Sequence, residues 1–557
     1  MSRQHVPAVI GLVASALVTV PVAAAVGATP PPAPPGPAAP AAPSPPPQAQ
    51  KPAPPATKVP PAPPASPASP APKAPVAPKA PAASNAPAAP KAPAARPKTP
   101  PPTAPAAKPP VPSAVAVPAA PAAPPPKPGT GEVPCSVPHL VSAISAANRK
   151  AGAETLRLTP GCVYRLTAGA NPFHPVNGLP VITDELTIDG RGATITRVAS
   201  APRFRVLLVG TTGMLTLHST TISGGSATDC PAYPDVPGMV CGGGISNLGS
   251  MVLTRSKVTA NRAESKLYAQ GGGIDSPGNA TVRSSVVSGN TVAYKGSENG
   301  GAAAGGGIAN DGPLTVEGAQ VINNMAWVRE NTESFAFGSG LAGLAQTTVK
   351  NSVVRGNRSL APGGFARAAL TNGASPELGR MTVTGSFVQG NLADAPNGVA
   401  QGGGITNNTL MTVSNTHVSG NRVAARGGTA RGGGIRLGPK AVLELSRSSV
   451  VGNVVSAPEG TAQGGGLDNP DGGRLTGTRS RILRNSVSAP DGTALGGGLY
   501  HATGTTTLDR TVVSGTRAID GGGIFKRSGT VTLTDTQVVF NTPNNCRPSE
   551  SVPGCVG

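Results

Sequence analysis

The sequence predicts an all-β protein: a right-handed parallel β-helix of about ten regular coils plus irregular N-terminal coils, with a capping helix, preceded by a disordered Pro/Ala-rich segment. Of the 65 prolines, 41 lie between Pro30 and Pro128, whereas 71 of the 74 glycines follow residue 128. After residue 240 a glycine triplet recurs about every 30 residues, and a short β-type run closed by asparagine keeps in step with it. Two independent markers in phase indicate a repeat architecture.

The chain begins with an apolar run from Val6 to Ala28, which follows Arg3 and ends in small residues. This pattern is typical of a secretory signal peptide, which we place at residues 1–28. The alternative is an uncleaved membrane anchor, but Pro7 and Pro21 interrupt the run and disfavour it. It is the only apolar run long enough to span a bilayer, so the sequence excludes a transmembrane bundle and predicts no membrane span after signal cleavage.

Residues 29–130 are rich in proline, alanine and spaced lysine, as in APKAPVAPKAPAASNAPAAPKAP. Proline fixes φ and removes a backbone donor, so this segment is predicted to be a disordered, extended linker. No acidic residue precedes Glu132, and ten of the basic residues lie in the first 128 positions. The remainder therefore carries 35 basic and 25 acidic residues. This balance indicates no nucleic-acid footprint, although the linker lysines favour contact with anionic wall polymers.

Residues 131–557 form the predicted β-helix domain, with an N-terminal cap and first coils at 135–225, regular repeats at 240–545 and a C-terminal cap at 546–557. One repeat buries too few aliphatic side chains to offset the ordering of about 30 residues, so neighbouring repeats must stack. Short β-branched runs exclude helical solenoids, and the low aromatic content disfavours propellers. The triplets lie at Gly242–Ile245, Gly271–Ile274, Gly305–Ile308, Gly402–Ile405, Gly432–Ile435, Gly464–Leu467, Gly496–Leu499 and Gly521–Ile524, with degenerate copies ending at Leu341 and Leu370.

The asparagine markers are expected to stack as a ladder inside the turns of successive coils, because each amide can donate to one neighbour and accept from the next. The glycines are expected to supply positive φ and close backbone approach at sharp bends. Between each asparagine and the next triplet we expect a loop of variable length. The predicted ladder residues are Asn261, Asn290, Asn324, Asn357, Asn391, Asn421, Asn453 and Asn485, followed by Thr516 in the same slot and then Asn541.

Both ends of the domain are expected to be protected. Ser136 can cap a helix that stops at Gly152 and covers the open end of the first coil. Six cysteines indicate an oxidising compartment, and they allow 15 pairings. Proximity in the sequence suggests Cys135–Cys162, Cys230–Cys241 and Cys546–Cys555. No C-x-x-C occurs and the histidines are scattered, so no metal site and no cofactor are predicted.

The GGGI triplet alternating with V-x-x-N resembles the repeats of polymorphic outer membrane proteins, whose units carry GGA[I/L/V] and FxxN. The segment from Phe387 to Asn391, FVQGN, is the copy most similar to the second element. The opening CSVPHLVSAISAAN resembles the start of secreted bacterial β-helix proteins that begin CSLREAI-x-AAN. The resemblance covers about residues 133–545 and implies a pectin-lyase-like β-helix displayed at a surface and used in adhesion. No segment of alternating strands long enough for an outer-membrane barrel follows, so an autotransporter route is not expected.

Aromatic and charged residues concentrate between the asparagine and glycine markers of the early coils. Such residues suit contact with sugar or peptide, although they can also simply close loops over the coil edge. In later coils Arg426, Glu459 and Asp491 fall at equivalent loop positions. They are expected either to form a column of ion pairs or a Ca²⁺ site, or to be solvated residues of turns. The candidate binding residues are Glu264, Tyr268, Tyr294, Glu298, Trp327, Glu330, Phe335 and Phe337.

The sequence favours binding over catalysis. Polysaccharide lyases and hydrolases need clustered acids, and no adjacent pair of aspartates occurs. Asp189-Gly190-Arg191-Gly192 is explained by turn chemistry, so no catalytic residue is named. We therefore expect a secreted or cell-surface adhesion module whose partner is cell-wall or extracellular polysaccharide or a host surface. A polysaccharide lyase or glycoside hydrolase on the same scaffold, and a structural cell-surface protein, are the alternatives.

Overall fold

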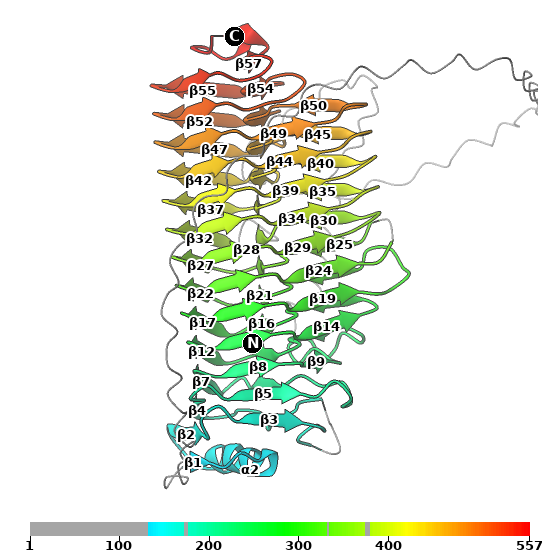
Figure 1. The fold of residues 1–557 in the computed structure, drawn as a ribbon, viewed down its shortest axis with the longest axis vertical. Coiled ribbons are helices and arrows are strands. Elements are labelled where there is room, and N and C mark those ends of the chain that lie inside the picture. The colour runs from blue at the N-terminus through cyan, green and yellow to red at the C-terminus, as the bar shows by residue number, and fades with distance from the viewer. Residues whose placement is uncertain (1–131, 172–175, 331–332, 374–378, 557) are drawn as a thin grey trace, which may run out of the picture. The chain divides into compact units, whose positions relative to one another are not determined.

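The computed structural model describes residues 132–171, 176–330, 333–373 and 379–556, and it confirms the predicted fold class. These residues form an all-β parallel β-helix of about 11 turns. Figure 1 shows the strands stacked coil on coil between helix α2 (Val137–Ala147) at one end and strand β57 (Cys546–Arg547) at the other. The predicted signal peptide and linker lie outside the described residues, so their boundaries stay predictions.

Each regular coil contributes one strand to each of five parallel sheets, which we number 1 to 5 in the order in which the chain visits them. Sheets 1, 2 and 3 contain 12, 14 and 13 strands, and sheets 4 and 5 contain nine each. Their first and last strands are β6 (Leu207–Val209) and β57 in sheet 1, β1 (Glu132–Val133) and β55 (Thr530–Thr534) in sheet 2, β3 (Val163–Leu166) and β56 (Gln537–Val539) in sheet 3, β9 (Ser226–Ala227) and β49 (Ser486–Ser488) in sheet 4, and β10 (Val240–Cys241) and β50 (Thr493–Leu495) in sheet 5.

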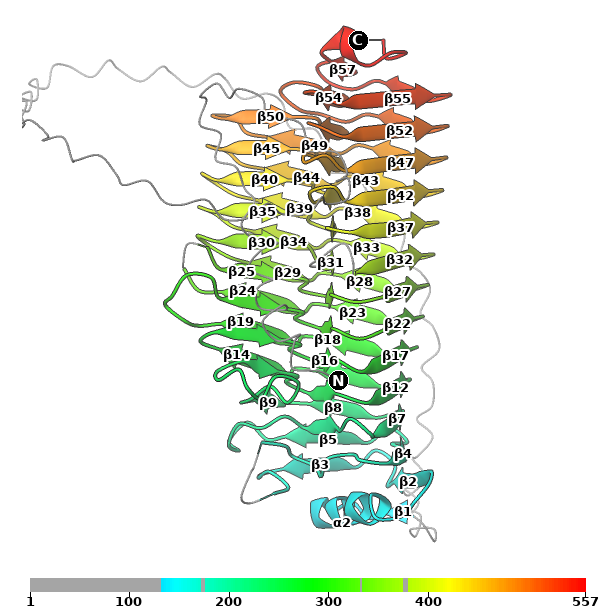
Figure 2. The same ribbon diagram turned by 180° about the vertical axis from the view of Figure 1, so that it is seen from behind.

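A single coil shows the pattern that the others repeat. The chain passes through five strands and then turns at the next glycine triplet into sheet 1 of the following coil; the strands are β36 (Ile405–Asn407), β37 (Leu410–Ser414), β38 (His417–Ser419), β39 (Arg422–Ala424) and β40 (Thr429–Arg431). Figures 1 and 2 show the sheet 4 and 5 strands projecting to one side of the stack.

The expectation of a variable loop between each asparagine and the next triplet was wrong. That segment holds the sheet 4 and sheet 5 strands, which have only three or four residues in most coils. Only one or two residues of each face inward, most often alanine or valine, such as Val423 and Ala430. A strand this short cannot show the alternation of polar and large apolar residues by which strands are recognised. The variable part is the short connection between the two strands.

The coils enclose two separate cores. Leucine, isoleucine and valine side chains from sheets 1, 2 and 3 fill the larger one, as Ile405, Val413 and Val418 do in this coil. Sheets 4 and 5 enclose a second, thinner core made almost entirely of alanine and valine. Burial of alanine carries no side-chain entropy cost. Because most inward side chains here are single methyl groups, sheets 4 and 5 can pack close together.

The glycine triplets and the asparagines meet at the narrow waist between these cores. The first glycine of a triplet, such as Gly402, has positive φ (+60°). The next two are needed for close approach: a Cβ on Gly404 would lie 2.8 Å from the Gly434 carbonyl oxygen and 2.9 Å from Asn421 Nδ2. The glycine triplet and the asparagine recur in phase along the sequence because, in each coil that has both, the glycine backbone packs directly against the asparagine side chain.

The asparagines form a continuous buried ladder along the stack. The side-chain amide of Asn421 donates to Val388 O and to Asn453 Oδ1, both at 2.9 Å. Its Oδ1 accepts from the backbone N–H and the side-chain amide of Asn391, at 3.1 and 2.9 Å. The same pattern runs from Asn261 to Asn485 and changes at Thr516, whose hydroxyl donates to Asn541 Oδ1 at 2.7 Å.

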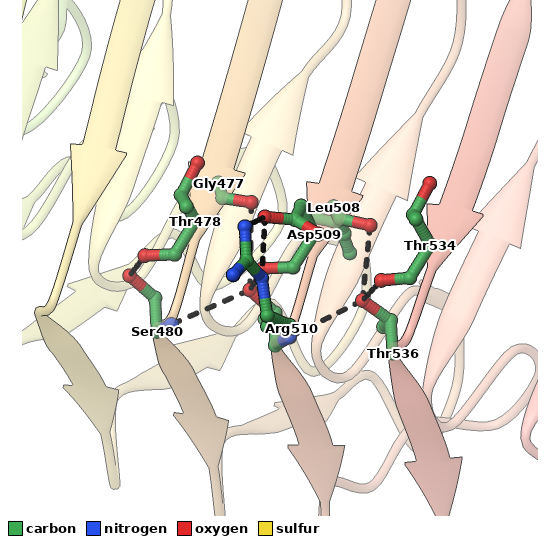
Figure 3. A network of polar contacts seen from close by, with 9 residues as sticks. Gly477, Thr478, Ser480, Leu508, Asp509, Arg510, Thr534 and Thr536 are labelled. Carbon is green, nitrogen blue, oxygen red and sulfur yellow. Dashed lines mark hydrogen bonds and ion pairs between the residues drawn. The ribbon is translucent and has the colours of Figure 1, made fainter.

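A second ladder, made of buried hydroxyl groups, lies at the turn between sheets 2 and 3. Figure 3 shows part of it, where the hydroxyls of Ser480 and Thr536 donate to the backbone oxygens of Thr478 and Thr534 at 2.9 and 3.0 Å. Ser480 N–H donates to the hydroxyl of Thr511 in the following coil at 3.4 Å. These hydroxyls hold turns whose first residue, such as Arg479 or Arg510, has positive φ.

The ends of the stack are closed by the helix and the disulfides. Helix α2 buries Leu140 and Ile144 against the first coil, and Ser136 occupies its N-cap position, but the Ser136 side chain does not make the expected capping hydrogen bond. It ends at Ala147 rather than near Gly152, and the side chain of the C-cap residue Asn148 donates to Val181 O at 2.6 Å and accepts from Thr183 N–H at 3.1 Å. The disulfides join the sequence-neighbouring cysteines, Cys135–Cys162, Cys230–Cys241 and Cys546–Cys555.

Candidate functional site

The candidate binding residues do not form one ridge. Two lie on the outer face of sheet 4, two lie on the connections beyond it, one is buried in the second core, and three lie on sheet 5. In that order they are Glu264 and Trp327, Glu298 and Glu330, Tyr294, and Tyr268, Phe335 and Phe337.

On the outer face of sheet 4, Glu264 forms ion pairs with Arg262 and Lys295, both at 2.8 Å. Trp327 is partly exposed on β24 (Met325–Val328), two coils further along the same column of side chains. Its neighbours in register are Ala293 and Leu360. Trp327, Ala293 and Leu360 thus form an aromatic and aliphatic surface on this face, with Glu264 two coils away from Trp327.

The remaining sheet 4 candidates differ in exposure. Tyr294 is 1% exposed, and its hydroxyl donates to Glu298 O at 2.5 Å, so it packs inside the second core. The side chains of Glu298 and Glu330 are exposed. In the later coils, Arg426 Nε lies 3.1 Å from Glu459 Oε1 and both side chains are exposed; this one ion pair is what the structure shows of the column of Arg426, Glu459 and Asp491.

The three sheet 5 aromatics lie near the corner at which sheet 5 turns into sheet 1 along the stack. We call it the glycine corner: it is formed by the side chains immediately before each glycine triplet, on sheet 5, and those two positions after its third residue, on sheet 1. Contacts across the triplet show that these side chains meet. Gln270 Nε2 donates to Asp275 Oδ1 at 2.9 Å, and Phe337 packs with Ala342. The pairs are Cys241–Ser246, Gln270–Asp275, Ala304–Ala309, Phe337–Ala342, Gln401–Thr406, Arg431–Arg436, Gln463–Asp468, Leu495–Tyr500 and Asp520–Phe525, and Arg367–Thr371 lies in the equivalent place, where Ala368 and Ala369 replace the triplet.

The N-terminal end of the glycine corner is acidic. Gln270 Nε2 also donates to Asp311 Oδ2 at 3.2 Å, and the Tyr233 hydroxyl donates to the same oxygen at 3.0 Å. Burial raises the pKa of Asp275 well above its usual range, and the neighbouring Asp311 raises it further. Burial also raises the pKa of Asp311. The loop closed by the Cys230–Cys241 disulfide packs against Tyr268 at this end.

The middle of the glycine corner is aromatic and then basic. The rings of Phe335 and Phe365 stack with centroids 4.6 Å apart, and the guanidinium of Arg367 lies 6.0 Å from the Phe335 centroid. Arg431 and Arg436 flank the triplet that begins at Gly432. The corner thus changes from acidic to aromatic to basic along the stack.

The corner holds many buried polar atoms that have no hydrogen-bond partner among the described residues. Buried polar groups in native proteins are nearly always paired with protein, water or a ligand. Gln401 is 3% exposed, Thr371 2% and Asp468 0%. The unpartnered atoms are Tyr268 Oη, Gln270 Oε1, Thr371 Oγ1, Gln401 Oε1, Gln463 Oε1, both carboxylate oxygens of Asp468, and Nε of Arg367, Arg431 and Arg436.

One grouping of potential metal ligands occurs among the described residues, Cys230 with Cys241 and Asp275. Both sulfur atoms belong to a disulfide, so this grouping does not offer thiolate ligands. In the same part of the chain, no helix is long and apolar enough to cross a membrane.

Sequence reasoning located one corner residue, Phe337, and two aromatics beside the corner, Tyr268 and Phe335, but not the corner itself. Asp275 and Asp311 are 36 positions apart, so a search for adjacent acids does not find them. A usable signal was present: the residues on either side of each GGGI or GGGL vary widely while the triplet stays the same.

No family model and no curated protein matches the chain, so the resemblance to polymorphic outer membrane proteins stays a prediction. Among solved structures, the chain is similar to a mutant tailspike protein of E. coli bacteriophage HK620, with 12% identity, a TM-score of 0.36, and 72% of this chain and 74% of that chain covered. A second tailspike mutant of this phage, in complex with a pentasaccharide, has 12% identity, a TM-score of 0.33 and the same coverage. PfbA, a surface adhesin of Streptococcus pneumoniae, has 11% identity, a TM-score of 0.28, and 72% and 87% coverage.

Proposed function

We propose that the β-helix binds glycan chains along the glycine corner and acts, outside the cell, as an adhesion or surface-binding module without catalysis. The observation that carries this proposal is the row of buried, unpartnered polar atoms, among them Gln401 Oε1 and Thr371 Oγ1. Sugar hydroxyls donate and accept hydrogen bonds at closely spaced positions, so a glycan lying along the corner can satisfy such a row. The stacked rings of Phe335 and Phe365 add an apolar surface of the kind that sugar-binding sites use.

Two further features support the proposal, the first its extracellular setting and the second the binding of a long chain. All six cysteines are joined in disulfides, which persist in oxidising compartments. The corner also extends over many coils, as a site for a long polymer requires.

The test is binding of a panel of neutral and acidic oligosaccharides to the full chain, measured by calorimetry, with two matched glutamine variants. Gln401→Leu removes a buried corner amide and is expected to weaken binding at least tenfold. Gln389→Leu changes a glutamine on the outer face of sheet 3, at the end of β33 (Phe387–Gln389), and is expected to leave affinity within twofold. Equal effects of the two variants, or no binding by any saccharide, would contradict the proposal.

Trp327→Ala separates the glycine corner from the outer face of sheet 4. Because Trp327 lies on the opposite side of the thin second core from the corner, its loss is expected to change glycan affinity less than Gln401→Leu does. The reverse order would move the site to sheet 4, with Glu264 and Trp327 as its binding residues.

A second candidate function, hydrolysis of a glycan, is favoured by one observation. Asp275 and Asp311 share the Gln270 amide in a buried setting that favours their protonated forms, as a general acid requires. Hydrolysis predicts release of reducing ends that is lost in Asp275→Asn and retained in Asp491→Asn, a change in an exposed loop. Absence of any product from the unaltered protein would leave binding as the function.

A further inference from the structure

Three arginine side chains converge on the middle of the glycine corner. Arg367 comes from β30 (Phe365–Arg367) and Arg431 from β40, both on sheet 5, and Arg436 comes from β41 (Ile435–Leu437) on sheet 1. Arg436 is 6% exposed, and the Nε atoms of all three arginines are buried without a hydrogen-bond partner among the described residues. Buried guanidinium groups normally have their donors paired.

The carboxylates nearby only partly balance these charges. Arg436 Nε lies 3.6 Å from Asp468 Oδ2, and its Nη2 lies 3.3 Å from Asp471 Oδ2. Burial raises the pKa of Asp468 to about 7, so near neutral pH this carboxyl group is only partly ionised. Burial, together with the charge of Arg436, lowers the pKa of Arg367 to about 9. A partly protonated Asp468 balances less of the positive charge of Arg436 than a fully ionised carboxylate would.

The spacing of the arginines suits a chain that carries charges at intervals. Strands of successive coils lie about 4.8 Å apart, so Arg367 and Arg431, which are two coils apart on sheet 5, are separated by about 10 Å. Between them lie the uncharged donors and acceptors of Gln401 and Thr406. A planar guanidinium pairs well with a carboxylate or phosphate oxyanion, and the neutral side chains suit hydroxyl groups.

We propose that the glycine corner between Arg367 and Arg436 is a binding site for an acidic glycan, a sugar or polyol chain that bears carboxylate or phosphodiester groups. This inference rests on the proposed glycan-binding function and adds the chemical class of the ligand and its position. Along sheet 1, Asp275 lies three coils (about 14 Å) from Thr371 and five coils (about 24 Å) from Arg436, and its burial favours the neutral acid, whereas the cationic side chains of the corner, among the described residues, are the three arginines. The anionic part of the ligand therefore binds at the arginines.

The test compares three probes on the full chain by calorimetry at one salt concentration: oligogalacturonate, the uncharged galactose oligomer of the same length, and poly(glycerol phosphate). The unaltered protein is expected to bind at least one anionic probe at least tenfold more tightly than the neutral one. Carboxylate and phosphodiester ligands are distinguished by which of the two anionic probes binds more tightly.

Matched variants separate a built site from general attraction to a basic protein. Arg431→Gln and Arg367→Gln are expected to weaken binding of the anionic probe at least tenfold, whereas Arg479→Gln, at an exposed turn outside the corner, changes it less than twofold. Thermal unfolding checks that each variant folds. If Arg367→Gln does not fold, the comparison of Arg431→Gln with Arg479→Gln is enough to test the inference.

Three outcomes would overturn the inference. Neutral and acidic probes bound equally would refute an acidic ligand while leaving glycan binding in place. Equal losses in Arg431→Gln and Arg479→Gln would show attraction by net charge alone. Failure of every probe to bind would refute the inference together with the proposed function.

Discussion

At the scale of single residues, stability depends on buried polar side chains that repeat once per coil. The Asn421 side chain makes four hydrogen bonds, two as donor and two as acceptor, within a ladder that continues into both neighbouring coils. Its position could be predicted from the sequence, because the asparagine closes a β-type run in nearly every repeat. Its pairing with the asparagines of the two neighbouring coils was expected with it, whereas its bonds to the Val388 carbonyl and the Asn391 backbone N–H could not be predicted, because they depend on where those strands lie in the fold.

Asn421→Ala is expected to lower the free energy of unfolding by roughly 3 kcal/mol, because it leaves the buried N–H of Asn391, the amide of Asn391 and the carbonyl of Val388 without their partner. Thr516→Ala removes a hydroxyl from a weaker step of the ladder and is expected to cost about 1 kcal/mol. Denaturant unfolding of both variants measures the difference. Equal small losses would show that the ladder contributes little.

His501 occupies a position that is asparagine in several coils, including Asn407 and Asn469. It is fully buried, and burial lowers its pKa from 6.5 to about 4, helped by the charge of Lys526. The folded state favours the neutral imidazole, so protonation of this group does not reduce the free energy of unfolding above pH 6.5. As the pH falls from 6.5 towards 4, the unfolded chain binds a proton that the folded protein does not, and the free energy of unfolding decreases.

The loss in acid is expected to reach roughly 3 kcal/mol for this one group. His501→Asn is expected to flatten the dependence of the unfolding free energy on pH between 6.5 and 4. His417→Asn, at an exposed position on sheet 3, serves as the control for the loss of a histidine. A curve with the same slope in both variants would place the acid sensitivity elsewhere.

At the scale of elements, the waist between the two cores explains which parts of the fold could be predicted from the sequence and which could not. The triplet and the asparagine were recognisable because each is tightly constrained by the other. Strands such as β39 and β40 were missed because a three-residue strand with one inward Val423 or Ala430 has no period to detect. The glycine corner was missed for a different reason: its side chains approach one another only after the sheets fold back at Gly402 or its equivalents.

Gly404→Ala is expected to destabilise the protein by about 2–4 kcal/mol, because the new methyl group would press on Asn421 and the Gly434 carbonyl at the waist. Gly427→Ala is the matched control. Gly427 has no atom within 4 Å of the added Cβ and its φ lies outside the left-handed region, so the change is expected to be neutral or slightly stabilising. Equal unfolding midpoints for the two variants would contradict a steric role for the triplet.

At the scale of the whole β-helix, each coil contacts mainly the coils on either side. The predicted stack, the cap and the neighbouring cysteine pairs all follow from this quasi-one-dimensional arrangement. The Cys135–Cys162 and Cys546–Cys555 disulfides lie at the two ends, and Cys230–Cys241 closes a side loop. No disulfide joins coils in the described residues between 242 and 545.

Reduction of the disulfides is therefore expected to loosen the ends and the side loop while the middle coils stay intact. Hydrogen exchange measured before and after reduction is expected to show lost protection in α2 and β57 and unchanged protection over residues 400–480. A uniform loss of protection across all coils would show that the β-helix unfolds as a single cooperative unit.

The two side chains that each coil contributes to the glycine corner belong to neither of the two large cores, as Gln401 and Thr406 illustrate. Under the proposed function, changes at these two positions alter the ligand that is bound, whereas the glycines, the alanines and the asparagine of the same coil are constrained by the packing of the coils. Over evolutionary time the corner is thus open to rapid divergence on a conserved scaffold. A duplicated coil would lengthen the recognised segment by one step and bring two new positions under selection.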